Sequence, residues 1–163
     1  AAMAIFRCVP LDRLYRSVEM RVLVLLAAML PLGLAMQSSG AAGKVVDGAL
    51  QFLPGNDPWI ALIVVYGVTA LMTEFVTNNA TAVLMTPLAI ALSVKLGVSP
   101  APFLVAVAFA ASTSFSTPIG YQTNTMVYGA GGYMFADFLR VGIPLNLLFW
   151  AVSAFAIPRL YPF

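Results

Sequence analysis

Residues 59–96 read WIALIVVYGVTALMTEFV, then TNNAT, then AVLMTPLAIALSVKL. The apolar blocks at 59–76 and 82–96 each approach the ~20 residues that a helix needs to cross a hydrocarbon core of ~30 Å. The pentapeptide between them, at 77–81, lacks the glycine, proline or lysine expected of an exposed loop. Two interpretations remain open. Either two helices cross the membrane and the pentapeptide is a surface turn, or they form a re-entrant hairpin whose tip lies at mid-membrane.

The composition of the whole chain predicts an all-α integral membrane protein. Of 163 residues, 61% are hydrophobic and 9% are charged, and the net charge is +2, whereas a soluble domain carries about 25% charged residues. These values exclude an ordinary cytosolic domain, a disordered tail and a nucleic-acid-binding surface. One cysteine and no histidine exclude a disulfide framework, a Cys/His zinc site and a Ser-His triad within this chain. We therefore expect no enzymatic activity and no nucleic-acid partner.

A second polar break follows at 112–125, which reads STSFSTPIGYQTNT. Seven of these fourteen residues are Ser or Thr, and Pro118 together with Gly120 prevents a continuous helix. About eleven apolar residues precede the break, which is too few to cross a bilayer. The break should therefore lie inside the membrane, within a discontinuous helix that covers 100–139.

The remaining apolar blocks complete one transmembrane unit over 1–163. We predict a cytoplasmic lead-in at 1–21, a helix at 22–36, an interfacial amphipathic helix at 37–52, the hairpin at 59–96, the discontinuous helix at 100–139 and a last helix at 141–157. This arrangement places five of the eight basic residues on one side, namely Arg7, Arg13, Arg16, Arg21 and Arg140. By the positive-inside rule that side is the cytoplasm, so the N-terminal end of the chain is expected there.

Polar residues in a bilayer core are tolerated only where they face protein or a water-filled cavity. Broken helices of this kind form the binding sites of secondary transporters, because freed carbonyls and hydroxyls coordinate sodium and exposed helix N-termini attract anions. Amide and hydroxyl side chains suit such a site because they accommodate a dehydrated ion without a buried full charge. The two breaks together therefore favour an ion or anion site.

Each polar residue also has a purely structural interpretation. Asn78 and Asn79 could cap the following helix, and Thr117-Pro118 could be a simple kink. Glu74, one helical turn before the pentapeptide, could be a paired buried acid or a proton carrier.

Two segments resemble the divalent anion–sodium symporter family, which carries dicarboxylates, citrate or sulfate. The segment TEFVTNNATA at 73–82 is similar to that family's Glu-Phe, Ser-Asn-Thr tip and Ala-Thr-Ala. The segment STPIGYQTN at 116–124 resembles the unwound loop opposite that tip. With VYG at 127–129 and GY at 132–133, the chain looks most like the citrate-transporter-like permeases.

The resemblance implies one inverted repeat of a secondary transporter, with a re-entrant hairpin and a discontinuous helix. Members have two such repeats, so the chain would be the C-terminal half and its partner the N-terminal half of the same transporter. A homodimer is also implied. The protein would be a multi-pass protein of the plasma membrane, which is the inner membrane in a bacterium.

The resemblance also implies the site residues and the activity. The substrate would contact Thr77, Asn78, Asn79, Thr117 and Pro118, and sodium would contact Thr73, Thr77, Asn78, Ser116 and Thr117. No cofactor is implied besides Na⁺ as coupling ion. The expected activity is sodium-coupled secondary transport of a small divalent anion by alternating access. Asn79 stands where the family has Thr, which leaves the substrate open. The alternatives are a proton-linked antiporter of ions or oxyanions that uses Glu74, and a non-transporting structural subunit.

Overall fold

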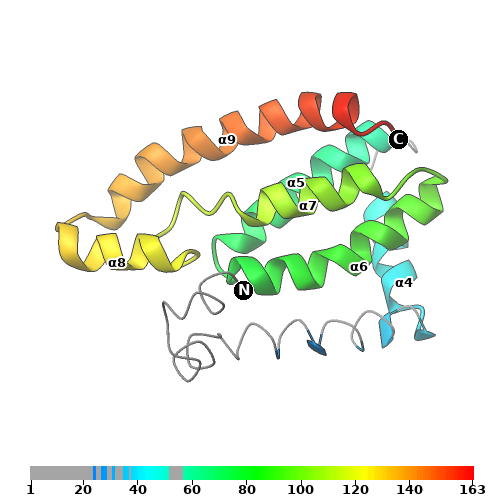
Figure 1. The fold of residues 1–163 in the computed structure, drawn as a ribbon, viewed down its shortest axis with the longest axis horizontal. Helices are drawn as coiled ribbons and strands as arrows, with labels where there is room; N and C mark the ends of the chain where they lie inside the picture. The colour runs from blue at the N-terminus through cyan, green and yellow to red at the C-terminus, as the bar shows by residue number, and fades with distance from the viewer. Residues whose placement is uncertain (1–23, 25–26, 29–30, 32–34, 37, 52–56) are drawn as a thin grey trace, which may run out of the picture.

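The computed structural model describes residues 24, 27–28, 31, 35–36, 38–51 and 57–163, and over these residues it contains helices and no strand. This confirms the predicted all-α class. The predicted lead-in at 1–21 lies outside the described residues, as does most of the predicted helix at 22–36. The helices shown in Figure 1 are α4 (Ala41–Gln51), α5 (Pro58–Thr73), α6 (Asn78–Leu96), α7 (Ala101–Ala111), α8 (Gln122–Gly131) and α9 (Phe135–Leu160).

Helices α5 and α6 form a hairpin. Helix α5 begins at Pro58, where the side chain of Asp57 accepts a hydrogen bond from Trp59 N at 2.9 Å. The break is shorter than the sequence predicts and lies earlier, at residues 74–77. Thr77 has extended backbone angles and is the N-cap of α6, so the residues from Asn78 onward already belong to the first turn of that helix.

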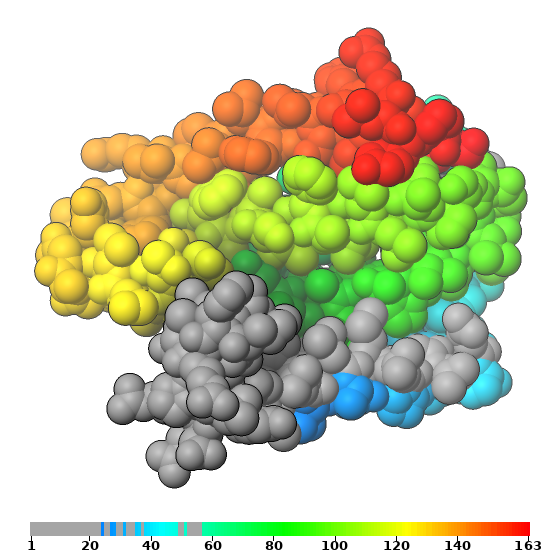
Figure 2. Space-filling view, in the orientation of Figure 1, coloured from blue at the N-terminus to red at the C-terminus, as the bar shows by residue number. Residues whose placement is uncertain are grey.

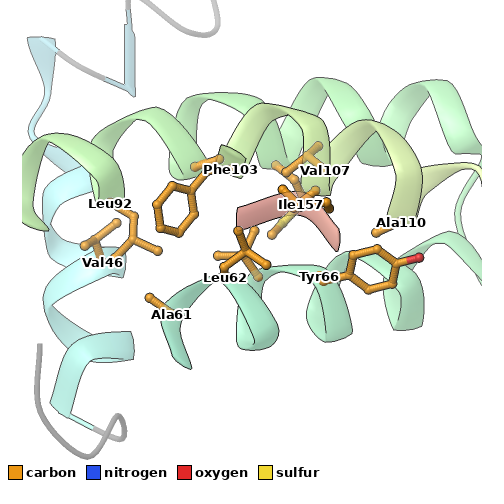
Figure 3. Close-up of a cluster of buried hydrophobic side chains, with 13 residues drawn as sticks. Val46, Ala61, Leu62, Tyr66, Leu92, Phe103, Val107, Ala110 and Ile157 are labelled. Carbon is orange, nitrogen blue, oxygen red and sulfur yellow. The ribbon is translucent and has the colours of Figure 1, made fainter. Parts of the chain in front are cut away.

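Helix α7 packs against both arms of the hairpin and forms the core with them. Gly97, with φ 69°, ends α6 in the left-handed conformation that glycine adopts readily, and this allows the chain to reverse into α7. Figure 3 shows Phe103 of α7 pointing into the space between Leu62 of α5 and Leu92 of α6, and Val107 of α7 beside Ile157 of α9. In the space-filling view, α7 lies between α9 and α6 on the visible face (Figure 2).

Helix α4 packs against α6 at the end of the hairpin remote from the tip. An ion pair between Lys95 of α6 and Asp47 of α4 joins the two helices. Within the predicted interfacial segment at 37–52, the helix itself covers Ala41–Gln51.

Two tryptophans fix α9 against α5. Trp59 Nε1 donates to Ala154 O at 2.9 Å, and Trp150 Nε1 donates to Ile63 O at 3.0 Å, so each helix supplies one indole to the other. An indole N–H that is shielded from water usually has a hydrogen-bond acceptor, and here each indole finds one on the other helix. The two bonds therefore set how α9 lies along the hairpin, which decides which of its residues reach the polar break.

The second half of the chain differs from the prediction at its element boundaries. Helix α8 ends at Gly131, because Gly132 adopts the left-handed conformation with φ 66°. Helix α9 then begins at Phe135, six residues before the predicted start at 141, because the Asp137 carboxylate accepts from Met134 N at 2.8 Å and caps its first turn. The discontinuous element is thus α7, residues 112–121 and α8.

Two of the described helices, α6 and α9, are long and apolar enough to cross a membrane. Along α9 large apolar side chains remain exposed in this chain, among them Leu147, Leu148, Val152 and Phe155. Exposed apolar surface of this extent indicates contact with lipid or with further protein.

Truncating Phe103 in the core should destabilise the complete protein far more than truncating Phe109 on the same helix. Phe103 is 0% exposed and Phe109 is 54% exposed. Phe103→Ala should lower the free energy of unfolding by about 3–5 kcal/mol through the cavity it leaves, and Phe109→Ala by much less. Reversible unfolding in mixed micelles measures both. Equal losses would show that the described core does not carry the stability of this region.

Candidate functional site

The hairpin tip and the loop at 112–121 are joined by hydrogen bonds. The hydroxyl of Ser114 donates to Thr73 O at 3.2 Å, and the hydroxyl of Thr117 donates to Glu74 O at 2.7 Å. These two carbonyls lie at the end of α5, where a helix leaves its last carbonyls without partners. Hydroxyls of the loop supply the missing donors. The two carbonyls at the end of α5 are therefore hydrogen-bonded inside the protein.

The side chain of Asn78 lies at the point where three oxygens converge. One amide atom of Asn78 lies 2.8 Å from Thr73 Oγ1, 3.2 Å from Ala111 O and 3.3 Å from Gly120 O. With the amide nitrogen at that position, Asn78 is a donor toward all three oxygens, and the Thr73 hydroxyl donates onward to Ala111 O at 2.9 Å. We call the group formed by Thr73, Asn78, Ala111 and Gly120 the oxygen cage.

The carboxylate of Glu74 joins three separate parts of the chain. Glu74 is buried, at 5% exposed. Its Oε1 accepts from Phe115 N at 3.2 Å, from Ser116 N at 3.0 Å and from Asn146 Nδ2 at 2.6 Å. Asn146 Nδ2 also lies 2.8 Å from Ser116 Oγ. One carboxylate oxygen thus links the hairpin tip to the loop and to α9.

Close backbone packing holds the loop in this position. A methyl group at Gly120 would overlap Thr73 O and Ser114 Oγ, and one at Gly142 of α9 would overlap the backbone of Phe115 and Ser116. Glycine is therefore required at both places for the hairpin tip, the loop and α9 to approach each other. The side chain of Asn124 fixes the loop further by donating to Ser114 O at 2.8 Å and to Thr117 O at 3.2 Å.

The structure brings most of the predicted site residues together. Thr73, Asn78, Ser116, Thr117 and Pro118 lie in or beside the contact between the two breaks, and all but the half-buried Asn78 are buried. The side chain of Asn78 bonds to Thr73 rather than capping α6. Thr117 likewise does more than form a kink, because its hydroxyl joins the loop to the hairpin.

Thr77 and Asn79 lie at the same tip with exposed side chains. Thr77 makes no side-chain capping bond to α6. Whether these residues and those in the contact bind substrate or sodium stays a prediction.

Sequence reasoning missed three residues that shape the site. Asn146 and Gly142 lie within an apolar helix, 72 and 68 residues after Glu74, and nothing in their local sequence indicates the loop that they contact. Asn124 stands inside the second polar break, but its residue type does not say which carbonyls it will meet. The one available signal was that an amide is rare in a helix as apolar as α9.

The sequence matches the profile of a citrate transporter family over residues 1–97 and 78–163, which together span the whole chain. The chain belongs to the citrate transporter family. This confirms the resemblance to the divalent anion–sodium symporters and to their citrate-transporter-like branch. It also supports a role in membrane transport rather than in enzymatic catalysis.

Three relatives of this chain illustrate the similarity. It is 41% identical over 160 residues to an uncharacterized transporter of Synechocystis, which covers 98% of the chain and 26% of the relative. It is 32% identical over 160 residues to a probable sodium/sulfate cotransporter of Chlamydomonas reinhardtii, covering 96% and 18%. It is 30% identical over 141 residues to a sodium-dependent dicarboxylate transporter of Staphylococcus saprophyticus, covering 86% and 27%. The chain thus spans about a quarter or less of the length of these relatives.

Two glycine-to-alanine substitutions should have opposite effects on stability. Gly142→Ala should lower the free energy of unfolding by about 1–3 kcal/mol, because its methyl group overlaps the loop backbone and cannot be accommodated by a side-chain movement. Gly129→Ala in α8 has no neighbouring atom within 4 Å, and alanine favours a helix over glycine by up to about 1 kcal/mol. Thermal unfolding of the complete transporter measures both. If Gly142→Ala were as stable as Gly129→Ala, the close contact between α9 and the loop would be refuted.

Proposed function

We propose that the complete protein is a sodium-coupled secondary transporter of a small divalent anion, such as a dicarboxylate, citrate or sulfate, and that it works by alternating access. The family membership and the sodium-dependent relatives named above support this proposal. Because the chain covers only part of those relatives, the activity belongs to a longer protein, in which the N-terminal half of the transporter faces the site described here.

The oxygen cage is the observation that carries the proposal. With the amide turned by 180°, Asn78 would direct Oδ1 toward Thr73 Oγ1, Ala111 O and Gly120 O, which would bring four oxygens close together. The Thr73 hydroxyl can donate to only one of these oxygens, so the remaining carbonyl and amide oxygens would favour a cation beside them, and unwound carbonyls with nearby side-chain oxygens are how broken helices bind sodium. The cage can therefore exist in a sodium-free state with the amide nitrogen inward and in a sodium-bound state with the amide oxygen inward.

The other predicted sodium ligands, Thr77, Ser116 and Thr117, remain candidates in this proposal. Ser116 and Thr117 lie on the loop that also carries Gly120, and Thr77 precedes Asn78 at the tip. The buried hydroxyl of Thr117 already bonds to Glu74 O. If the Thr117 hydroxyl also binds the ion, the same group both holds the two breaks together and coordinates sodium.

The substrate anion would bind where helix N-termini and the sodium ion supply positive potential. Thr77, Asn78 and Asn79 stand at the N-terminus of α6, and Thr117 and Pro118 precede the N-terminus of α8. No lysine or arginine occurs between 59 and 131 except Lys95, whose partner is Asp47. An anion at this site would depend on helix N-termini, amide donors and sodium, which favours co-transport with a cation.

The contact of Thr73 and Glu74 with the second break supports the re-entrant hairpin over a surface turn, while Phe75, Val76 and Thr77 of the tip are exposed in this chain. Thr73 and Glu74 are buried against the second break, whereas the polar groups of a surface turn would face water. In this arrangement α9 reaches across the membrane region, whereas α6 begins at the tip within it and runs back out. The proposal includes a multi-pass plasma-membrane protein with its N-terminal end in the cytoplasm and a homodimeric assembly.

Loss of the Thr73 hydroxyl should weaken sodium coupling selectively. In proteoliposomes that contain the complete transporter, Thr73→Val and Asn78→Ala should each raise the sodium concentration for half-maximal uptake by about 10-fold or more, because each removes an oxygen ligand. The uptake of labelled succinate, citrate and sulfate, with and without an inward sodium gradient, measures this. Thr86→Val is the matched control, since that hydroxyl donates only to Ala82 O within α6.

Uptake driven by sodium in the wild type and weakened only in the cage variants would support the proposal. Uptake driven by a proton gradient and indifferent to sodium would instead favour the proton-linked antiporter. A folded transporter that moves none of the three anions under either gradient would favour the structural subunit.

A further inference from the structure

Two buried oxygens beside the loop have no hydrogen-bond donor among the described residues. They are Oε2 of Glu74 and Oδ1 of Asn146. The two side chains are already in contact, because Asn146 Nδ2 donates to Glu74 Oε1 at 2.6 Å. Both oxygens therefore belong to one polar cluster, to which Ser116 contributes its hydroxyl. A buried acceptor without a partner loses its hydration without compensation, so the cluster lacks a positively charged or donating partner.

The charge of the cluster is also uncompensated. Glu74 is the only charged side chain among the buried residues that the structure describes. Its three hydrogen-bond donors are neutral and all of them approach Oε1. Oε2 therefore has no donor among the described residues. A buried carboxylate is costly unless it is paired with an opposite charge.

The elements packed around Glu74 bring no basic side chain to it. In α5, α7 and the loop at 112–121 there is no lysine or arginine, and Lys95 lies at the far end of α6, paired with Asp47. In α9, Asp137 and Arg140 lie nine and six residues before Asn146, and Arg140 is exposed. The remaining titratable groups of these elements are Arg159, in the last turn of α9, and the phenols of Tyr66 and Tyr121.

We propose that Glu74 Oε2 and Asn146 Oδ1 bind a sodium ion, directly or through one water molecule, at a site separate from the oxygen cage. One carboxylate among neutral oxygens balances a single positive charge, whereas a divalent ion would leave a net charge buried. The described residues also contain no group of three acidic, histidine or cysteine side chains that would favour a divalent metal. The choice of sodium rests on the proposed function, which brings this ion to the neighbouring cage.

Glu74→Gln tests the site with little change in shape. Gln keeps an oxygen that can accept from Phe115 N and Ser116 N, and it places an NH₂ group beside Asn146 Oδ1 where the ion would lie. We would measure thermal unfolding of the purified complete transporter, without substrate, in sodium chloride and in choline chloride of equal ionic strength. In choline the variant should unfold at a higher temperature than the wild type, since it buries no charge. Sodium should raise that temperature by only about half as much, because the cage alone remains.

Asp137→Asn is the matched control, because it also converts an acid to an amide on an element that contacts the cluster. The Asp137 carboxylate caps the start of α9 and an asparagine can do the same. This control should show the full sodium-induced rise and no higher unfolding temperature in choline.

Asn146→Asp adds a negative charge to the cluster, whereas Glu74→Gln removes one. It therefore still tests the proposal if Glu74→Gln does not fold. Two adjacent buried carboxylates should lower the unfolding temperature in choline and enlarge the rise caused by sodium. A structural role alone would instead lower the unfolding temperature equally in both salts.

Two results would overturn the proposal. One is a full sodium-induced rise in Glu74→Gln, which would make the carboxylate a structural anchor, or the holder of a proton if the stability of this variant also no longer varies with pH. The other is a wild-type protein that sodium does not stabilise. A Glu74-dependent sodium response without any uptake of anions would support this site and count against the proposed transport.

Discussion

A buried carboxylate at the end of α5 is the contact on which the polar centre of this protein depends. Glu74 Oε1 accepts hydrogen bonds from two backbone amides of the loop and from Asn146 of α9. The donors lie 41, 42 and 72 residues from it along the chain. Charge-assisted hydrogen bonds in a region of low dielectric constant are strong and directional. This acceptor is the one side-chain group described that bonds to both the loop and α9 from the hairpin tip, and the hydroxyl bonds of Ser114 and Thr117 reinforce its contact with the loop.

Two neighbouring residues of the tip contact different parts of this centre. Thr73 directs its hydroxyl to Asn78 and Ala111, toward the oxygen cage, whereas Glu74 directs its carboxylate to the loop and α9. An ion bound by one residue would therefore act on contacts made by the next. In a transporter this adjacency offers a physical route from ion binding to the relative position of the hairpin and α9, because both sites share the same short segment of backbone.

The local sequence explains where the helices break but not how the breaks meet. Pro118 and Gly120 stop a helix wherever they stand together, and a run of hydroxyls and amides in an apolar chain predicts a buried polar site. These rules located both breaks and pointed to Asn78, and the resemblance to the symporter family added Thr73 to the candidates. They placed the tip at 77–81 instead of 74–77 and the start of α9 at 141 instead of Phe135, because an N-cap is decided by which residue adopts extended angles.

The sequence by itself determined the membrane class, the family, the hairpin and the discontinuous helix, since these follow from apolar block length and from local motifs. Only the tertiary structure decided that Asn146 meets Glu74 and that Gly142 admits the loop backbone against α9. These contacts join segments far apart in the sequence, and an asparagine or glycine within an apolar helix carries no local signal of its partner. The position of α9, set by the reciprocal bonds of Trp59 and Trp150, supplies that information through packing.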